Sequence, residues 1–301
     1  METPVVLIIF RRPHTTQRVL EAIRQAQPKQ LFVIADAPRP GKAGEAEKCA
    51  ETRQLIETID WDCQVYRDYA DQNLGSFKRV PSGLDWVFSQ VDRAIILEDD
   101  CLPDLSFFAF CEELLDRYAE DDRIFTVAGN NFQFGRPPLP TSYYFSRYHH
   151  SWGWATWKRA WQYFDGAMTH WPEVKEQQLL KAVFDDRRAL NYWETIFQAV
   201  YENHIEAWDY RWTLSCWLQN ALHILPSVNL VSNIGFGEDA SHTTSATHPH
   251  ANLPTLPMTF PLIHPELMIR DAEADDFSQN TYYHPTWPFR IRRKLRQFLP
   301  S

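Results

Sequence analysis

The sequence lacks the cysteine patterns of zinc sites and disulfide scaffolds. Its 301 residues include five cysteines, and no two of them are separated by two residues. An odd number of cysteines without such spacing is typical of reduced thiols. We therefore predict a cytoplasmic protein with reduced cysteines.

Long hydrophobic runs are also absent near the first residue. The run at 5–10 is too short to span a membrane or to form a signal-peptide core, and no basic residue precedes it. Residues 289–299 hold five basic residues and no acid, with apolar residues near helical spacing. They fit either peripheral contact with an anionic inner-membrane face or a solvated basic tail.

An excess of positive charge is missing as well. The formal net charge is -9, so nucleic acid is not expected as a partner. Hydrophobic residues make up 44% and charged residues 23% of the chain, which is enough apolar material for a core.

Strand-like and helix-like segments alternate in the first half of the chain. Strands are predicted at 5–10, 31–34, 64–67, 94–97 and 124–128, and most of these segments are short apolar runs. Helical patterns lie between them at 15–27, 44–58, 82–90 and after Asp104. This order predicts an α/β fold with a mainly parallel central sheet flanked by helices. The second half is aromatic-rich, with helices predicted at 173–184 and 189–203.

Three adjacent acids, Glu98, Asp99 and Asp100, end the strand predicted at 94–97. Like charges this close raise each other's pKa or attract a cation. Ligands of open α/β sheets bind outside the carboxyl ends of the strands, and hard oxygen ligands suit Mg²⁺ or Mn²⁺. The alternative is a solvated acidic turn before the next helix.

The triplet resembles the DxD-type motif of GT-A-fold glycosyltransferases, most closely the EDD of N-acetylglucosaminyltransferase I-like enzymes. The resemblance continues in order through residues 4–13, 35–36, 73–75 and 151–154, and it spans roughly residues 4–242. It implies a GT-A-type fold and a metal-dependent hexosyl- or N-acetylhexosaminyltransferase. The implied donor is a nucleotide-sugar, with UDP as the expected nucleotide, and the implied cofactor is Mn²⁺ or Mg²⁺.

The family's motif implies a role for each acid of the triplet. Asp100 is the implied metal ligand, Asp99 the contact to the sugar or ribose, and Glu98 a supporting contact. The arginine after the first strand points to Arg12 at the nucleotide, with Arg11 beside it, because a guanidinium can clamp a diphosphate. Both arginines could instead be surface charges.

The resemblance also implies contacts from two further loops. Asp36, after the second strand, is the implied acceptor for the uracil N–H. The loop with Asn73 and Gly75 permits close backbone approach, and Lys78 or Arg79 could neutralise phosphate or merely face solvent.

Two acids near residue 207 are candidates for the catalytic base. An inverting transfer needs a base for the acceptor hydroxyl, and enzymes of the family carry it at the start of a helix. We choose Asp209, with Glu206 second; Asp209 could equally be a helix N-cap.

The Gly-rich loop at 232–243 contains further candidates. His242 resembles the late histidine with which many GT-A enzymes bind metal, and it could also be an ordinary surface residue. Glu238 and Asp239 are further base candidates.

The aromatic run at 148–157 could line a sugar pocket or belong to the core. We include Trp152, Gly153 and Trp154 among the nucleotide-sugar-binding residues. His149 and His150 are not assigned to a metal, because adjacent residues of a strand point to opposite faces.

The sequence therefore predicts one glycosyltransferase domain over residues 1–301. Residues 1–130 form its nucleotide-sugar-binding half, 131–250 its acceptor and catalytic half, and 251–301 a C-terminal extension. The alternatives are a nucleotidyltransferase that makes nucleotide-sugars, disfavoured by the missing Gly-rich loop after the first strand, and a non-catalytic carbohydrate-binding protein. The acceptor, whether glycan, lipid-linked or protein, is not indicated by any motif.

Overall fold

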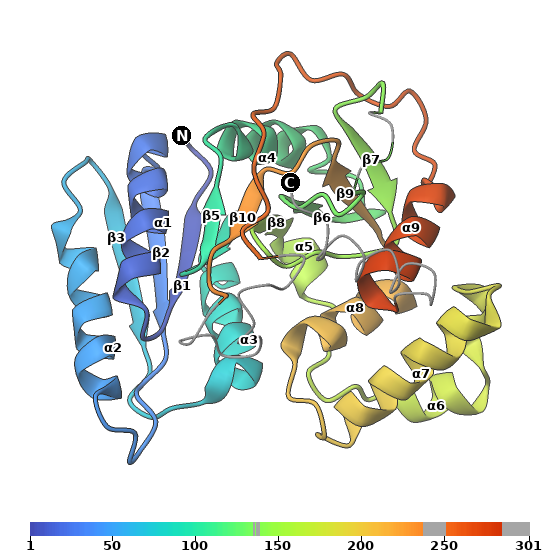
Figure 1. Ribbon diagram of the computed structural model, residues 1–301, viewed down its shortest axis with the longest axis horizontal. Coiled ribbons are helices and arrows are strands. Elements are labelled where there is room, and N and C mark those ends of the chain that lie inside the picture. The colour runs from blue at the N-terminus through green and yellow to red at the C-terminus, as the bar shows by residue number, and fades with distance from the viewer. Residues whose placement is uncertain (135, 137–138, 237–250, 285–301) are drawn as a thin grey trace, which may run out of the picture.

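The structure is a computed structural model that describes residues 1–134, 136, 139–236 and 251–284. Its centre is an eight-stranded sheet in the order β3-β2-β1-β4-β8-β6-β9-β7 (Figure 1). The strands are β1 (Val5–Ile9), β2 (Gln30–Ala35), β3 (Gln64–Tyr69), β4 (Arg93–Glu98), β6 (Ile124–Ala128), β7 (Tyr143–Ser146), β8 (Trp154–Trp157) and β9 (Leu222–Pro226).

The β3-β2-β1-β4 side of the sheet is entirely parallel. Strands β1, β2 and β4 are short apolar runs whose residues are mostly buried, as expected for parallel strands covered by helices on both faces. Ile8 of β1 lies opposite Glu98 of β4. The loops that follow these two strands therefore meet at the same edge of the sheet.

The other side of the sheet is mixed. Strand β8 lies between β4 and β6 and is antiparallel to both, while β9 is parallel to β6 and antiparallel to β7. Only β8 and β7 thus oppose the direction of the other six strands. The predicted α/β class is confirmed, with a large, mainly parallel central sheet flanked by helices.

Helices cover both faces of the sheet. Alternate residues of β1 show the division, since Val5 and Leu7 pack with α1 and α4, whereas Val6 packs with α3 and α8. The helices of these layers are α1 (Pro13–Ala26), α2 (Glu45–Gln54), α3 (Gly75–Phe88), α4 (Ser106–Arg117), α5 (Lys158–Trp161) and α8 (Trp208–Leu218).

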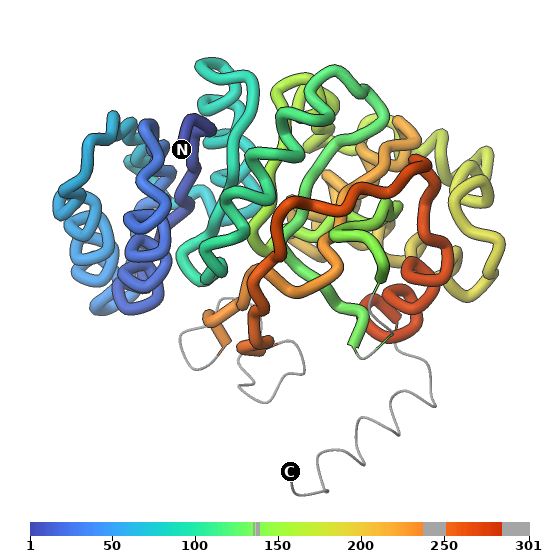
Figure 2. The backbone as a smooth tube through the Cα atoms, turned by 90° about the horizontal axis from the view of Figure 1, so that it is seen from above, coloured from blue at the N-terminus to red at the C-terminus, as the bar shows by residue number. Residues whose placement is uncertain are grey.

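A separate aromatic cluster lies beside the second half of the sheet. Trp171, Trp193 and Trp217 are buried in it, and they join α6 (Trp171–Glu176), α7 (Arg187–Tyr201) and α8 (Figure 1). The chain then returns across the surface, where residues 251–270 run from the short β5 (Cys101–Pro103) and β10 (Val231–Asn233) pair towards β7 (Figure 2). It ends in α9 (Ala272–Ser278) and the π-helical turn Gln279–Tyr283.

Some predicted boundaries were wrong. Helix α3 begins at Gly75 rather than at residue 82, and Pro81 lies inside it although proline usually starts a helix. The helix predicted at 173–184 is broken into α6 and the 3-10 turn Leu179–Ala182, because Gln178 between them has a left-handed conformation with φ 55°. Strands β5, β7, β8, β9 and β10 were not predicted, because each is only three to five residues long and gives a weak sequence pattern.

Candidate functional site

The acidic triplet lies where β4 ends. Glu98 is the last residue of β4, and Asp99 and Asp100 form the turn before β5. Both aspartates are buried, with 3% and 8% of their surface exposed. The alternative of a solvated acidic turn is therefore wrong for Asp99 and Asp100.

Arg12 clamps the two buried aspartates. Its Nη2 lies 2.5 Å from Oδ1 of Asp99, and its Nη1 lies 2.8 Å from Oδ2 of Asp100. The backbone N–H of Phe10 donates to Oδ2 of Asp99 at 3.2 Å. These contacts follow from the parallel pairing of β1 and β4, which brings together the loops after Ile9 and Glu98.

The cluster holds more negative charge than Arg12 can compensate. Burial, together with the nearby Asp100 and Asp99, raises the pKa of Glu98 to about 8, against the opposing effect of Arg12. Burial also raises the pKa of Asp99 to about 6, against the opposing effect of Arg12. A cation that binds here would relieve this unfavourable charge.

The described residues fit a metal only in part. Asp99 and Asp100 offer the carboxylate oxygens that Mg²⁺ and Mn²⁺ prefer. In the part of the chain that the structure describes, however, no three His, Cys, Asp or Glu residues are grouped so that they could hold a metal ion. The two aspartates alone would therefore leave most coordination positions of an ion to ligands outside the described residues.

Gly235 covers the Arg12–Asp100 ion pair. A Cβ atom on Gly235 would lie 2.0 Å from Oδ2 of Asp100 and 2.5 Å from Nη1 of Arg12. The N–H of Ile234 donates to the carbonyl of Asp100 at 2.8 Å, which holds this backbone against the cluster. We did not predict Gly235 as a site residue, because its contact with Asp100 joins positions far apart in the sequence.

Asp36 holds the N-terminus of α3. Its carboxylate accepts hydrogen bonds from the N–H groups of Leu74 at 2.9 Å and Gly75 at 2.8 Å, and from the Asn73 side chain at 3.2 Å. The N–H of Ala37 donates to the same carboxylate at 2.9 Å. Asp36, Asn73 and Gly75 are therefore brought together by contacts with each other, and the contact of Asp36 with uracil stays a prediction.

The other basic candidates in the first half of the chain, Arg79, Lys78 and Arg11, have different surroundings. Arg79 is 4% exposed, and its guanidinium donates to the carbonyls of Ala35 and Asp68 and pairs with the Asp68 carboxylate at 2.7 Å. Lys78 is exposed. Arg11 lies 3.5 Å from Glu45. Arg79 thus ties the ends of β2 and β3 together, which makes Lys78 the more accessible candidate for a phosphate.

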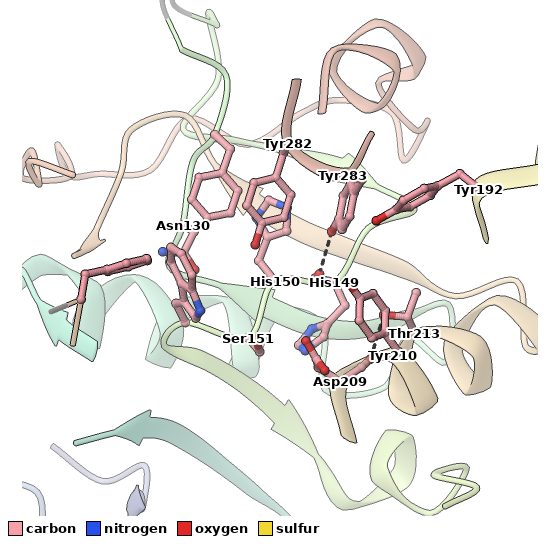
Figure 3. Close-up of a pocket in the computed structure, with 13 residues that line it drawn as sticks. Asn130, His149, His150, Ser151, Tyr192, Asp209, Tyr210, Thr213, Tyr282 and Tyr283 are labelled. Atoms are coloured by element: carbon pink, nitrogen blue, oxygen red, sulfur yellow. Dashed lines mark hydrogen bonds between the residues drawn. The ribbon is translucent and has the colours of Figure 1, made fainter. Parts of the chain in front are cut away.

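A cavity of about 280 Å³ lies in the second half of the chain (Figure 3). It is bordered by the connection that precedes β8, by α7 and α8, and by the π-helical turn. Its lining residues are Asn130, Phe132, His149, His150, Ser151, Trp152, Tyr192, Asp209, Tyr210, Thr213, Phe236, Tyr282 and Tyr283.

Only one of the two base candidates at residues 206 and 209 lines the cavity. Asp209 lies in the first turn of α8 and lines the cavity, whereas Glu206 is exposed and does not belong to the lining. The N-cap position falls on Ala207, so the N-cap alternative for Asp209 is wrong. After burial and the neighbouring acids, the charge of Asp209 also raises the pKa of Glu98, so the cavity is within electrostatic reach of the triplet.

The aromatic run is divided between cavity and core. Trp152 lines the cavity, whereas Trp154 is 1% exposed and stacks on Trp208 with a centroid distance of 5.9 Å. Gly153, with φ 67°, has no room for a side chain, because a Cβ would lie 2.7 Å from Val231. The structure therefore gives Trp154 a packing role and leaves Trp152 at the cavity.

His149 and His150 both line the cavity, which we did not predict. They lie between β7 and β8 rather than in a strand, so the rule of alternating faces does not apply to them. Burial lowers the pKa of His150 to about 4 and that of His149 well below its usual value, and both are neutral at pH 7.

Several predicted features fall outside the described residues. These are the base candidates Glu238 and Asp239, the metal candidate His242 and the basic tail at 289–299. Within the described part of the chain, no helix is both long and apolar enough to cross a membrane.

Comparisons with known proteins identify no family. No family model matches the chain, and no curated protein matches it significantly. S. aureus TarS 1-349 has a similar structure, with a TM-score of 0.43 and 11% sequence identity over 75% of this chain and 58% of that one. This chain thus spans little more than half of that protein.

Two further solved structures are similar over most of their own length. Mouse xyloside xylosyltransferase 1, in its apo form, has a TM-score of 0.36 and 12% identity over 72% of this chain and 81% of that one. A CMP:2-keto-3-deoxy-manno-octonic acid synthetase complexed with CTP has a TM-score of 0.35 and 16% identity over 60% of this chain and 86% of that one. At these scores the likenesses assign no activity.

Proposed function

We propose that the protein is a metal-dependent glycosyltransferase that moves a sugar from a nucleotide-sugar, with UDP as the nucleotide, to an acceptor hydroxyl. One observation carries this proposal. The buried Asp99–Asp100 pair, clamped by Arg12 at the carboxyl end of β4, lies within electrostatic reach of a cavity that contains Asp209. A donor and an acceptor can therefore bind at neighbouring places.

The acidic cluster is the proposed donor site. Asp100 and Asp99 would hold the divalent ion together with the donor's phosphate oxygens. A bound ion of this kind neutralises the diphosphate as it leaves. Arg12 uses two of its nitrogens on the aspartates and keeps further N–H donors for phosphate oxygens.

Asp209 is the proposed general base. It would accept the proton of the acceptor hydroxyl as that oxygen attacks the anomeric carbon, the diphosphate leaves from the opposite side, and the configuration inverts. Asp209 is preferred to Glu206 because it lines the cavity and Glu206 does not. Glu238 and Asp239 remain the other proposed candidates.

Calorimetric titration with UDP, in Mn²⁺ and in EDTA, tests the donor site. We expect binding in Mn²⁺ that EDTA abolishes and that the isosteric variant Asp100→Asn loses. Asp122→Asn is the matched control, because that side chain is 93% exposed and far in sequence from the triplet. UDP binding that is the same in EDTA, or unchanged in Asp100→Asn, would rule out the proposed metal site.

A product assay separates the proposal from a nucleotidyltransferase. A glycosyltransferase of this kind slowly hydrolyses UDP-sugars in the absence of acceptor. Release of pyrophosphate from UTP and a sugar 1-phosphate, without any cleavage of UDP-sugars, would instead show a nucleotidyltransferase.

A further inference from the structure

We propose that Arg211 is a positioning residue that links the start of α3 to the first turn of α8, the turn that carries Asp209. The inference rests on the proposed function, because it takes the start of α3 as part of the nucleotide site and Asp209 as the base. It adds a physical connection between these two places. Helix α8 packs against both α3 and α7 (Figure 1).

Arg211 lies on a different face of α8 from Asp209. It is 3% exposed and does not belong to the cavity lining, whereas Asp209 does. Residues two positions apart in a helix do not share a face, so the two side chains leave the same turn in different directions. A contact that holds Arg211 in place therefore also fixes the backbone from which Asp209 extends.

The guanidinium of Arg211 joins α8 to the end of α7. Its Nη1 donates to the carbonyl of Gly166 at 2.5 Å, and its Nη2 donates to the carbonyl of Val200 and to Oδ1 of Asn203, both at 2.9 Å. Val200 lies in the last turn of α7, where the helix dipole favours a cation. Because α7 also carries Tyr192 of the cavity lining, this guanidinium holds two sides of the cavity together.

The ring of Phe77 provides the contact with α3. The guanidinium carbon of Arg211 lies 4.3 Å from the centre of this ring, within the range of a cation–π interaction. Phe77 lies in the first turn of α3, two residues after Gly75, whose N–H donates to Asp36 at 2.8 Å. Arg211 therefore contacts the same turn of α3 that Asp36 holds.

The surroundings of Arg211 strengthen its contact with the ring. The three hydrogen-bond acceptors described above are uncharged, since they are two carbonyls and a side-chain amide. Burial lowers the pKa of Arg211, and Asp165 opposes this effect. An arginine stays charged in proteins, and a desolvated cation gains more from an aromatic face than a hydrated one does. Removal of the ring should therefore loosen the hold of α3 on Arg211.

A ligand bound at the start of α3 should steady α8 through this contact. Bound UDP restricts the turn that carries Phe77, and the ring in turn restricts Arg211. Local opening of a helix exposes its amides to solvent, so hydrogen exchange measures the effect without an acceptor substrate. Binding that suppresses the opening slows the exchange even where the average structure does not change.

The test uses the full chain and compares hydrogen exchange, measured by mass spectrometry, with and without saturating UDP and Mn²⁺. We expect the ligands to slow exchange both at residues 74–80, at the start of α3, and at residues 211–215 in α8. In Phe77→Leu, residues 74–80 should still be protected, whereas the protection of residues 211–215 should fall about tenfold, the effect of one desolvated cation–π contact. Phe77→Tyr keeps the ring and should keep the protection of both segments.

Two further variants assign the effect to Arg211. Arg211→Lys keeps the charge, but its single ammonium cannot replace the fork of donors, so the protection of residues 211–215 should fall as in Phe77→Leu. If Arg211→Lys does not fold, the two Phe77 variants decide the question. Phe277→Leu is the matched control, because it removes an arginine–ring contact of 5.9 Å with Arg136, in α9, and should leave both segments protected.

A purely structural arginine predicts a different result. It would lower the thermal stability of the variants and leave the response of α8 to UDP unchanged. Equal protection of residues 211–215 in the unmodified protein and in Phe77→Leu would therefore overturn the inference, and so would an equal loss in the leucine and tyrosine variants.

The same samples distinguish the two proposals. UDP binding in Mn²⁺ without protection of residues 211–215 in the unmodified protein would count against the inference alone. Absence of UDP binding in the unmodified protein would count against the proposed function and the inference together.

Discussion

Gly235 offers a sharp test of the donor site, because an alanine there has no room. A Cβ on residue 235 would lie 2.0 Å from Oδ2 of Asp100, whereas ordinary van der Waals contacts of a Cβ begin at 3.4 Å. The difference, 3.4 − 2.0 = 1.4 Å, is the distance by which the carboxylate or the backbone must move. The further contact with Arg12 at 2.5 Å means that both partners of the ion pair are displaced.

A displacement of about 1 Å in a group that positions a substrate can cost on the order of 10²-fold in rate. We therefore expect Gly235→Ala to lower kcat/KM for the donor by about 10²-fold and to weaken UDP binding in Mn²⁺. The backbone of Gly235 does not have a positive φ, so the effect comes from contact rather than from conformational strain.

Gly166→Ala is the control for this substitution. A Cβ on Gly166 would meet only Phe164, at 3.2 Å, and should leave donor binding unchanged. Circular dichroism and thermal unfolding of both variants check that the fold is retained. If folded Gly235→Ala bound UDP as tightly as the unmodified protein, the close contact with Asp100 would be refuted.

Three other substitutions test the site and the fold. Asp209→Asn should lower transfer by about 10²–10⁴-fold with unchanged UDP affinity, and Glu206→Gln should not; the reverse ranking would exclude Asp209 as the base. Asp36→Ala leaves the N–H groups at the start of α3 without their acceptor and should lower the free energy of unfolding by about 1–3 kcal/mol in urea titrations. Burial lowers the pKa of His150 from 6.5 to about 4, so between these pH values the unfolded chain binds a proton that the folded chain does not. The stability from this histidine is therefore present above pH 6.5 and is lost as the pH falls towards 4, by about 3 kcal/mol in all. In His150→Gln the free energy of unfolding should fall less steeply over this range, and an unchanged slope would show that His150 is not buried in its neutral form.

The parallel half of the fold could be predicted from the sequence because its signals are local. The segments that become β1, β2, β3 and β4 alternate with helical patterns, and this order alone implies a parallel sheet. The meeting of Arg12 with the acidic triplet depends in addition on the pairing of β1 with β4, which the order of elements along the chain does not give. The start of α3 could not be predicted, because Asp36 holds it by hydrogen bonds across 38 and 39 positions of the chain.

The residues that line the cavity were predicted less completely than the acidic triplet. The two histidines show the physical reason. His149 and His150 have the sequence pattern of a strand, in which they would point to opposite faces, yet they belong to a connection that starts after Ser146. Whether such a connection lines a cavity depends on α7, α8 and the turn at 279–283, which pack against it from distant parts of the sequence. The high aromatic content of residues 148–157 indicated a pocket or a core, but it could not distinguish Trp152, which lines the cavity, from Trp154, which lies in the core.

The antiparallel strand β8 explains why the acidic triplet and the cavity are neighbours. Its register pairs Arg93 with Trp157 and Ile96 with Trp154. Because the two strands are antiparallel, one residue forward along β4 corresponds to one residue back along β8. The same register, continued beyond the paired residues, places residue 152 opposite Glu98. Consistent with that, a Cβ on Gly153 would lie 3.2 Å from the side chain of Leu97. Trp152 therefore lies beside the acidic triplet across the sheet and also lines the cavity.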